Sequence, residues 1–135
     1  MSFFEKIKSV NQQFILPMLN DGDFKMYIKR EDQIHPIVSG NKFRKLKYNV
    51  QEAKGLKKNC LITFGGAYSN HLLATAYVGK NENLKTLAFV RGEELKNINY
   101  NSTLQKCNDF GMKLIFISRE DYRKRNEIDY INYIK

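Results

Sequence analysis

The spacing of apolar residues changes within the first third of the chain. Over residues 24–31 apolar and polar side chains alternate, a period of two that predicts a half-buried strand. From Lys42 onward apolar residues recur every three or four positions, which predicts an amphipathic helix that ends near Gly55. Asn41 is the expected N-cap of this helix, so Lys42 falls in its first turn, beside the positive end of the helix dipole.

The rest of the chain alternates short apolar runs with helical patterns. The expected strands are 60–64, 84–90 and 113–118, and the expected helices are 69–80, 102–110 and 121–135. Gly79 and Gly111 are expected to end the first two of these helices, because glycine commonly terminates a helix. Strands that alternate with helices predict an α/β fold, a three-layer sandwich with a mainly parallel sheet and right-handed crossovers.

The composition fits a single folded domain. Of the 135 residues, 42% are hydrophobic and 13% aromatic, which is enough to build a core. No apolar run reaches the length of a membrane span, and the charged start lacks the apolar core of a secretory signal, so we expect a cytoplasmic protein without membrane contact. Cys60 and Cys107 do not have metal-site spacing, so we expect reduced core cysteines and no bound metal.

The net charge of +9, from 23 Lys and Arg against 14 Asp and Glu, raises the question of nucleic-acid binding. The cations are spread along the chain, with modest clusters over 42–47 and 122–125 and no RNP, zinc-finger or basic-helix pattern. A solvated basic surface explains the charge better, and nucleic acid is not an expected partner.

Two stretches carry candidate chemistry. In SGNKFRKLKY, residues 39–48, a glycine bend places Lys42 in a first helical turn close to other cations, a setting that favours the neutral amine needed to form an imine. A solvated surface lysine is the alternative, because most lysines are exposed. In FGGAYSNH, residues 64–71, two glycines follow a buried strand and bring Ser69 and Asn70 to a helix N-terminus.

Such a turn, at the carboxyl edge of a parallel sheet, suits a phosphate or carboxylate. A helix cap without any ligand remains the alternative for Ser69 and Asn70. The chain lacks GxGxxG, GxxxxGK[ST] and GxSxG, which argues against a dinucleotide fold, a nucleotide P-loop and a serine hydrolase. A reactive lysine and an anion-binding turn in one domain together suggest chemistry on an amino acid through a carbonyl cofactor.

The ordered motifs of the chain resemble one enzyme family. KREDQIHPIVSGNKFRKLKY at 29–48, TFGGAYSNHLLATA at 63–76, RGEE at 91–94 and FISREDYR at 116–123 look like the 1-aminocyclopropane-1-carboxylate deaminase and D-cysteine desulfhydrase family. The resemblance extends from about Phe24 to the last residues. It implies a tryptophan-synthase-β-like fold, called fold type II, and the cofactor pyridoxal 5'-phosphate.

The resemblance also implies roles for individual residues. Lys42 would carry the cofactor as a Schiff base and act in catalysis, and Asn70 would hydrogen-bond the cofactor ring oxygen. The resemblance places Ser69 among the catalytic residues. Ser69 would also hold the substrate carboxylate, together with Asn70 and His71. The deaminases are expected to have glutamine where this chain has His71, which favours the desulfhydrase-like branch or an uncharacterised branch of the family. His35, beside Pro36, receives no catalytic task.

Family members are longer than this chain, and this difference implies a division of the sequence. Residues 1–44 are expected to belong to the large domain, residues 45–135 to form a small α/β domain, and the C-terminal half of the family fold to be absent. The expected function is the N-terminal part of an enzyme that deaminates or desulfhydrates a small amino acid, a homodimer when full-length. The alternative is a non-catalytic α/β domain that binds an anion or a partner.

Overall fold

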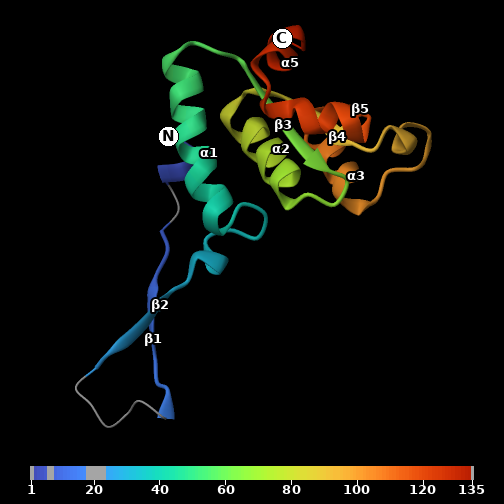
Figure 1. The fold of residues 1–135 in the computed structure, drawn as a ribbon. Coiled ribbons are helices and arrows are strands. Elements are labelled where there is room, and N and C mark those ends of the chain that lie inside the picture. Colours follow the sequence, from blue (N-terminus) through green and yellow to red (C-terminus); the bar gives the residue numbers. More distant parts are fainter. Residues whose placement is uncertain (1, 6–7, 18–23, 135) are drawn as a thin grey trace.

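The structure, a computed structural model, describes residues 2–5, 8–17 and 24–134 (Figure 1). The strands are β1 (Asn11–Phe14), β2 (Met26–Lys29), β3 (Cys60–Gly66), β4 (Lys85–Arg91) and β5 (Met112–Ile117). The α-helices are α1 (Gly40–Gly55), α2 (Asn70–Glu82), α3 (Ser102–Asp109), α4 (Arg119–Arg123) and α5 (Ile128–Tyr133). Short 3₁₀ turns cover Phe3–Glu5, Glu31–Gln33, Glu93–Asn97 and Lys124–Asn126.

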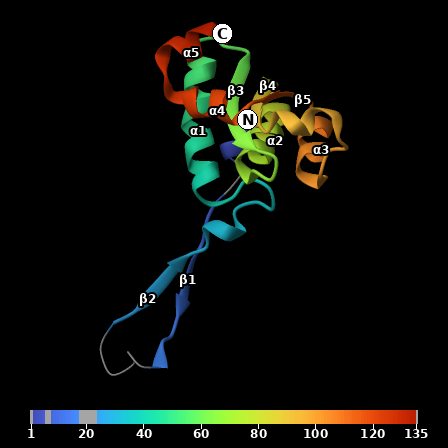
Figure 2. The same cartoon turned by 45° about the vertical axis from the view of Figure 1, so that its right-hand side comes forward.

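A parallel sheet of three strands, in the order β3-β4-β5, forms the centre of the fold. Consecutive residues of a strand point to opposite faces. Gly65 faces Leu72 of α2, whereas the ring of the preceding Phe64 packs 6.3 Å from that of Tyr122 in α4. Helices α2 and α4 therefore cover opposite faces of the sheet (Figures 1 and 2). This confirms the predicted three-layer α/β fold.

Two clusters of buried side chains hold the layers together. The first joins α1 to α2 and to the N-terminal turn, and consists of Phe4, Ile34, Val38, Phe43, Leu46, Val50, Ala74 and Val78. The second joins α2, α3 and the sheet, and consists of Ala67, Leu72, Ala76, Ala88, Val90, Leu104, Cys107 and Met112. Because α2 contributes to both clusters, its position is fixed relative to α1 and to the sheet.

Strands β1 and β2 form a separate antiparallel ribbon that projects from the body of the molecule (Figure 1). The prediction of a half-buried strand over 24–31 was wrong in its burial, since two residues of its apolar face, Phe24 and Ile28, are 84% and 50% exposed. No layer packs on the ribbon within the described part of the chain, so neither face is covered. The predicted domain boundary between residues 44 and 45 falls within α1 and stays a prediction.

Helix ends differ from the predictions in three places. Ser39, not Asn41, is the N-cap of α1. Helix α2 continues through Gly79 to Glu82, because Gly79 serves close packing: a Cβ there would overlap Thr86 and lie 3.0 Å from a backbone oxygen. The single helix expected over 121–135 is divided into α4, a 3₁₀ turn and α5. Residues 123–126 contain no apolar side chain that packing could bury along a continuous helix.

The sequence also led to expectations for Gly111 and for the two cysteines. Gly111 has a φ of +86° just beyond α3, as expected of a helix-ending glycine. Cys107 is fully buried and Cys60 only half-buried, and both are free thiols, so the expectation of two core cysteines holds for Cys107 alone. No helix in the described residues is long and apolar enough to span a bilayer. Those residues also contain no cluster of metal-ligating side chains.

Candidate functional site

Helices α1 and α2 run in the same direction with their N-termini adjacent. At their C-terminal ends, Lys54 of α1 forms an ion pair with Glu82 of α2. At their N-terminal ends, the charges of Lys42 and Lys45 on α1 act on His71 of α2. The positive ends of two helix dipoles therefore meet in one place, which favours an anion there.

Lys42 is the third residue of α1 and is half-buried. No side chain caps the N-terminus of this helix, and Gly40 takes a left-handed φ of +57° as the chain enters it. The neighbouring Arg44 is neutralised by Glu31 through contacts of 3.1 and 2.6 Å. Among the described residues Lys42 has no hydrogen-bond or ion-pair partner, so its amine is available to a ligand.

The turn after β3 brings Ser69 and Asn70 to the start of α2. The Ser69 amide donates to the Gly66 carbonyl at 3.0 Å, and the Ser69 hydroxyl accepts from the His71 amide at 3.2 Å. Ser69 is therefore the N-cap of α2, and its contact with a ligand stays a prediction. This bond uses the hydroxyl as an acceptor, which leaves the hydroxyl hydrogen able to donate to a ligand.

Two residues of this turn have contrasting surroundings. A Cβ on Gly65 would lie 2.6 Å from Leu72 Cγ, so only glycine allows β3 to approach α2 this closely. Asn70, the first residue of α2, is exposed and faces solvent beside Ser69. Its amide group has no hydrogen-bond partner within the described chain. Asn70 is thus accessible to a ligand that approaches the helix end.

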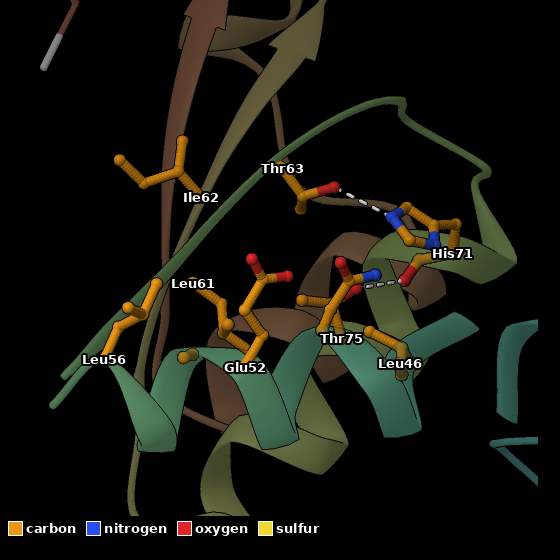
Figure 3. Close-up of a pocket in the computed structure, with 10 residues that line it drawn as sticks. Leu46, Glu52, Leu56, Leu61, Ile62, Thr63, His71 and Thr75 are labelled. Carbon is orange, nitrogen blue, oxygen red and sulfur yellow. Dashed lines mark hydrogen bonds between the residues drawn. The ribbon is translucent and has the colours of Figure 1, made fainter. Parts of the chain in front are cut away.

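His71 lines an open pocket of about 310 Å³ between α1, β3 and α2 (Figure 3). Its Nε2 lies 2.8 Å from Thr63 Oγ1 on β3, and α1 contributes Leu46, Asn49 and Glu52 to the lining. Burial lowers the pKa of His71, and the positive charges of Lys45 and Lys42 lower it further. His71 is therefore neutral near pH 7 and can both donate and accept a hydrogen bond.

The structure places Lys42 near enough to His71 for its charge to act on that ring, although 29 positions separate the two residues. Of the four predicted site residues, His71 alone lines the pocket. Thr63 is a member of this region that the sequence did not reveal. The signal available was slight: Thr63 is a polar residue within the apolar run CLITF, and a strand residue that faces a helix needs a partner for its hydroxyl. The contact with His71 depends on tertiary packing, which the sequence pattern does not encode.

Comparison with known proteins gave sequence relatives but no matching family model. A protein of Thermotoga maritima named as a putative 1-aminocyclopropane-1-carboxylate deaminase is 36% identical over 122 residues, which cover 90% of this chain and 38% of the relative. A bifunctional D-cysteine desulfhydrase/1-aminocyclopropane-1-carboxylate deaminase of Arabidopsis thaliana is 39% identical over 59% of this chain and 20% of its own length. A D-cysteine desulfhydrase of Salmonella paratyphi A is 38% identical over 56% of this chain and 23% of its own length.

Solved structures agree on the fold. O-ureido-L-serine synthase superposes with a TM-score of 0.52 at 19% identity, over 93% of this chain and 37% of that enzyme. A variant of that synthase bound to O-ureido-L-serine superposes with a TM-score of 0.51 over 87% of this chain. The predicted fold class, part of a fold type II architecture, is thereby confirmed. The chain spans less than two fifths of the length of each of these proteins. Its sequence is therefore similar to the N-terminal part of proteins that are named as 1-aminocyclopropane-1-carboxylate deaminases and D-cysteine desulfhydrases.

Proposed function

We propose that this chain forms the N-terminal part of a pyridoxal-phosphate-dependent enzyme that deaminates or desulfhydrates a small amino acid of the 1-aminocyclopropane-1-carboxylate or D-cysteine class. The names of the relatives support this class of reaction. One structural observation carries the proposal: a lysine without a partner and the Ser69–His71 turn lie at the adjoining N-termini of two parallel helices.

The groups at this point fit the proposed cofactor by their chemistry. Pyridoxal phosphate is an anionic aldehyde, and the region offers a primary amine, a hydroxyl and a carboxamide beside two positive helix ends. Lys42 would hold the cofactor through a covalent bond to Nζ, and Asn70 would donate to the oxygen of its ring. When bound, the cofactor would supply an electron sink for the reacting carbon of the substrate.

The remaining steps fall to side chains of this chain. Ser69 and His71 would hold the substrate carboxylate, where the positive end of α2 favours a negative charge. Lys42 Nζ would accept and return a proton at the reacting carbon, a role that its lack of an ion-pair partner permits. Neutral His71, backed by Thr63 Oγ1 at 2.8 Å, would donate to the carboxylate without repelling Lys42.

A complete site needs more than this chain. The chain spans 38% of the Thermotoga relative, and we expect the contacts to the cofactor phosphate to come from the part of such an enzyme that has no counterpart here. The 135-residue chain by itself is then expected to have little activity. Pairing into a homodimer and a cytoplasmic location also stay predictions.

A cofactor-trapping experiment tests the assignment of Lys42. The purified chain is mixed with pyridoxal phosphate, reduced with borohydride, digested and mapped by mass spectrometry. We expect Lys42 to carry most of the label, because its amine is half-buried and lies at an anion-attracting helix end. Lys58, exposed and just beyond the opposite end of α1, provides the control.

Lys42→Ala should abolish the selective label, whereas Lys58→Ala should leave it unchanged. Labelling that is scattered evenly over the surface lysines would contradict a prepared site in this chain and would favour a non-catalytic anion-binding domain. A second experiment adds the C-terminal part of the Thermotoga relative as a separate polypeptide. Cofactor retention should rise on mixing, and no gain would count against the division of the site proposed here.

A further inference from the structure

Asn101 uses both ends of its side chain to join two segments that meet at the carboxyl edge of the sheet. Its Oδ1 accepts from the Thr103 amide at 3.0 Å and from the Leu104 amide at 2.9 Å, which caps α3. Its Nδ2 donates to the Ala67 carbonyl oxygen at 3.1 Å. These partners fix the orientation of the carboxamide, because amide donors face the oxygen and a carbonyl faces the nitrogen.

The carbonyl that Asn101 holds belongs to the turn that carries the candidate site. Ala67 is buried and lies between Gly66, the last residue of β3, and the N-cap Ser69. The other end of the link is the first turn of α3, which packs through Leu104 into the core. The 66–71 turn, in which Tyr68 and Asn70 are exposed, is thus tied to the core of the fold.

We propose that Asn101 is a positioning residue: through its amide it holds the 66–71 turn so that Ser69 and Asn70 present their polar groups to a ligand. As far as the ligand is concerned, this inference rests on the function proposed above. Asn101 itself lies on the β4–α3 connection and is a residue to which neither the resemblance nor the site geometry assigns a role. The backbone anchor at Ala67 stands two residues before the cap of α2.

The two roles of the Asn101 side chain, which are to cap α3 and to donate to the Ala67 carbonyl, can be separated by substitution. Aspartate caps helices as well as asparagine does, but it has no hydrogen to donate. Asn101→Asp therefore keeps the cap of α3 and loses the bond to Ala67, where its carboxylate oxygen would meet the carbonyl oxygen. Asn101→Ala loses both. Asn99→Asp is the matched control, because Asn99 is exposed in the same loop and the substitution adds the same charge.

Amide hydrogen exchange, measured by NMR on the 135-residue chain, tests the link without any cofactor. In Asn101→Asp the amides of Ser69 and His71 should exchange about fivefold to tenfold faster, as expected for the loss of one hydrogen bond, while those of Thr103 and Leu104 keep their rates. In Asn101→Ala both pairs should exchange faster. Asn99→Asp should change neither pair.

Cofactor trapping at Lys42 then tests the functional half of the inference. Asn101→Asp should lower the label at Lys42 about fivefold relative to Asn99→Asp. If Asn101→Asp left the exchange rates of the Ser69 and His71 amides unchanged, or made the amides of α3 exchange faster by the same factor, the positioning role would be overturned. Faster exchange in the turn with undiminished labelling would show that the turn is held for stability alone, which also overturns it. If the parent chain is not labelled at Lys42, the proposed function fails, and the exchange result still decides whether Asn101 positions the turn.

Discussion

Replacing Glu82 by glutamine should destabilise the chain and weaken the alignment of α1 and α2. The Glu82 side chain is 2% exposed, and its carboxylate accepts from the Ser2 hydroxyl at 2.7 Å, from the Phe3 amide at 2.6 Å and from Lys54 Nζ. Glutamine keeps the shape and one acceptor oxygen, but its amide hydrogens would face the Lys54 ammonium. The substitution thus removes one charge without opening a cavity.

The magnitude follows from the exposure of the two partners. Breaking a fully buried ion pair costs about 3–5 kcal/mol, and one hydrogen bond to a charged group contributes about 1.5–3 kcal/mol. The Lys54 side chain is 47% exposed, so water can solvate its ammonium once the carboxylate is gone. We therefore expect Glu82→Gln to lower the free energy of unfolding by about 2 kcal/mol at pH 7.

The pH dependence gives a sharper test. Burial raises the pKa of Glu82, but the bonds from Lys54, Ser2 and the Phe3 amide outweigh it, so the pKa lies below its ordinary value of 4.5. Because the pKa of Glu82 is lowered in the folded chain, the stabilisation by its carboxylate is present above pH 4.5 and is lost as the pH falls through the folded-state pKa. The difference between parent and variant should therefore shrink in acid.

Urea unfolding followed by far-ultraviolet circular dichroism measures both effects, and Lys54→Met completes a double-mutant cycle. The two single substitutions should be less than additive in the double variant, by about 1 kcal/mol, because they remove the same contact. A Glu82→Gln protein as stable as the parent at pH 7, or a difference that persists undiminished at about pH 3, would refute the reasoning.

Three further outcomes are expected. Gly79→Ala should lower the free energy of unfolding by about 1–2 kcal/mol, because the overpacking against Thr86 outweighs the gain in helix propensity. Gly55→Ala should be neutral or stabilising, because there is open space around the added Cβ. Equal effects of the two substitutions in urea unfolding would contradict the packing argument. His35 Nδ1 accepts hydrogen bonds from two backbone amides, and burial lowers the pKa of His35 below 6.5, so the free energy of unfolding should fall as the pH drops below that value. His35→Asn should make the free energy of unfolding less dependent on pH in this range. An unchanged pH dependence would show that His35 does not contribute to it. Burial raises the pKa of Cys107 to about 11, so a thiol reagent at pH 8 should modify Cys60 in the native chain and Cys107 only after unfolding, as mass spectrometry would show.

The layered part of the fold was accessible from the sequence because its signals are local. Each strand of the parallel sheet is a short apolar run, as is typical of parallel strands that lie between layers of helices. Gly111 marked the end of α3 by its position after the periodic residues. The ribbon differs: NQQF of β1 contains one apolar residue and no alternation, so its pairing with β2 arises only from the tertiary structure.

Four residues of the candidate site were named from the sequence, but Thr63 and the contacts within the site were not foreseen. Ser69 could be named as a cap or a ligand group from its place after two glycines, and the structure shows the cap. The direction of His71 could not be foreseen, because a residue at a helix start can face the solvent or the neighbouring helix. The register that sets Thr63 2.8 Å from its ring comes from the packing of α2 on β3. Likewise, the role of Gly79 depends on the distant strand that it contacts.

The parallel arrangement of α1 and α2 has a practical consequence for any binding assay. Two positive helix ends and the charges of Lys42 and Lys45 act on one small region, and such a field attracts every small anion in the solution. Phosphate and sulfate buffers would then compete with a phosphorylated or carboxylated ligand, and added salt would slow its association, since the Debye length falls from about 30 Å at 0.01 M to about 10 Å at 0.1 M. Weak binding in phosphate-buffered saline would then reflect competition by the buffer phosphate as well as the affinity of the protein for the ligand.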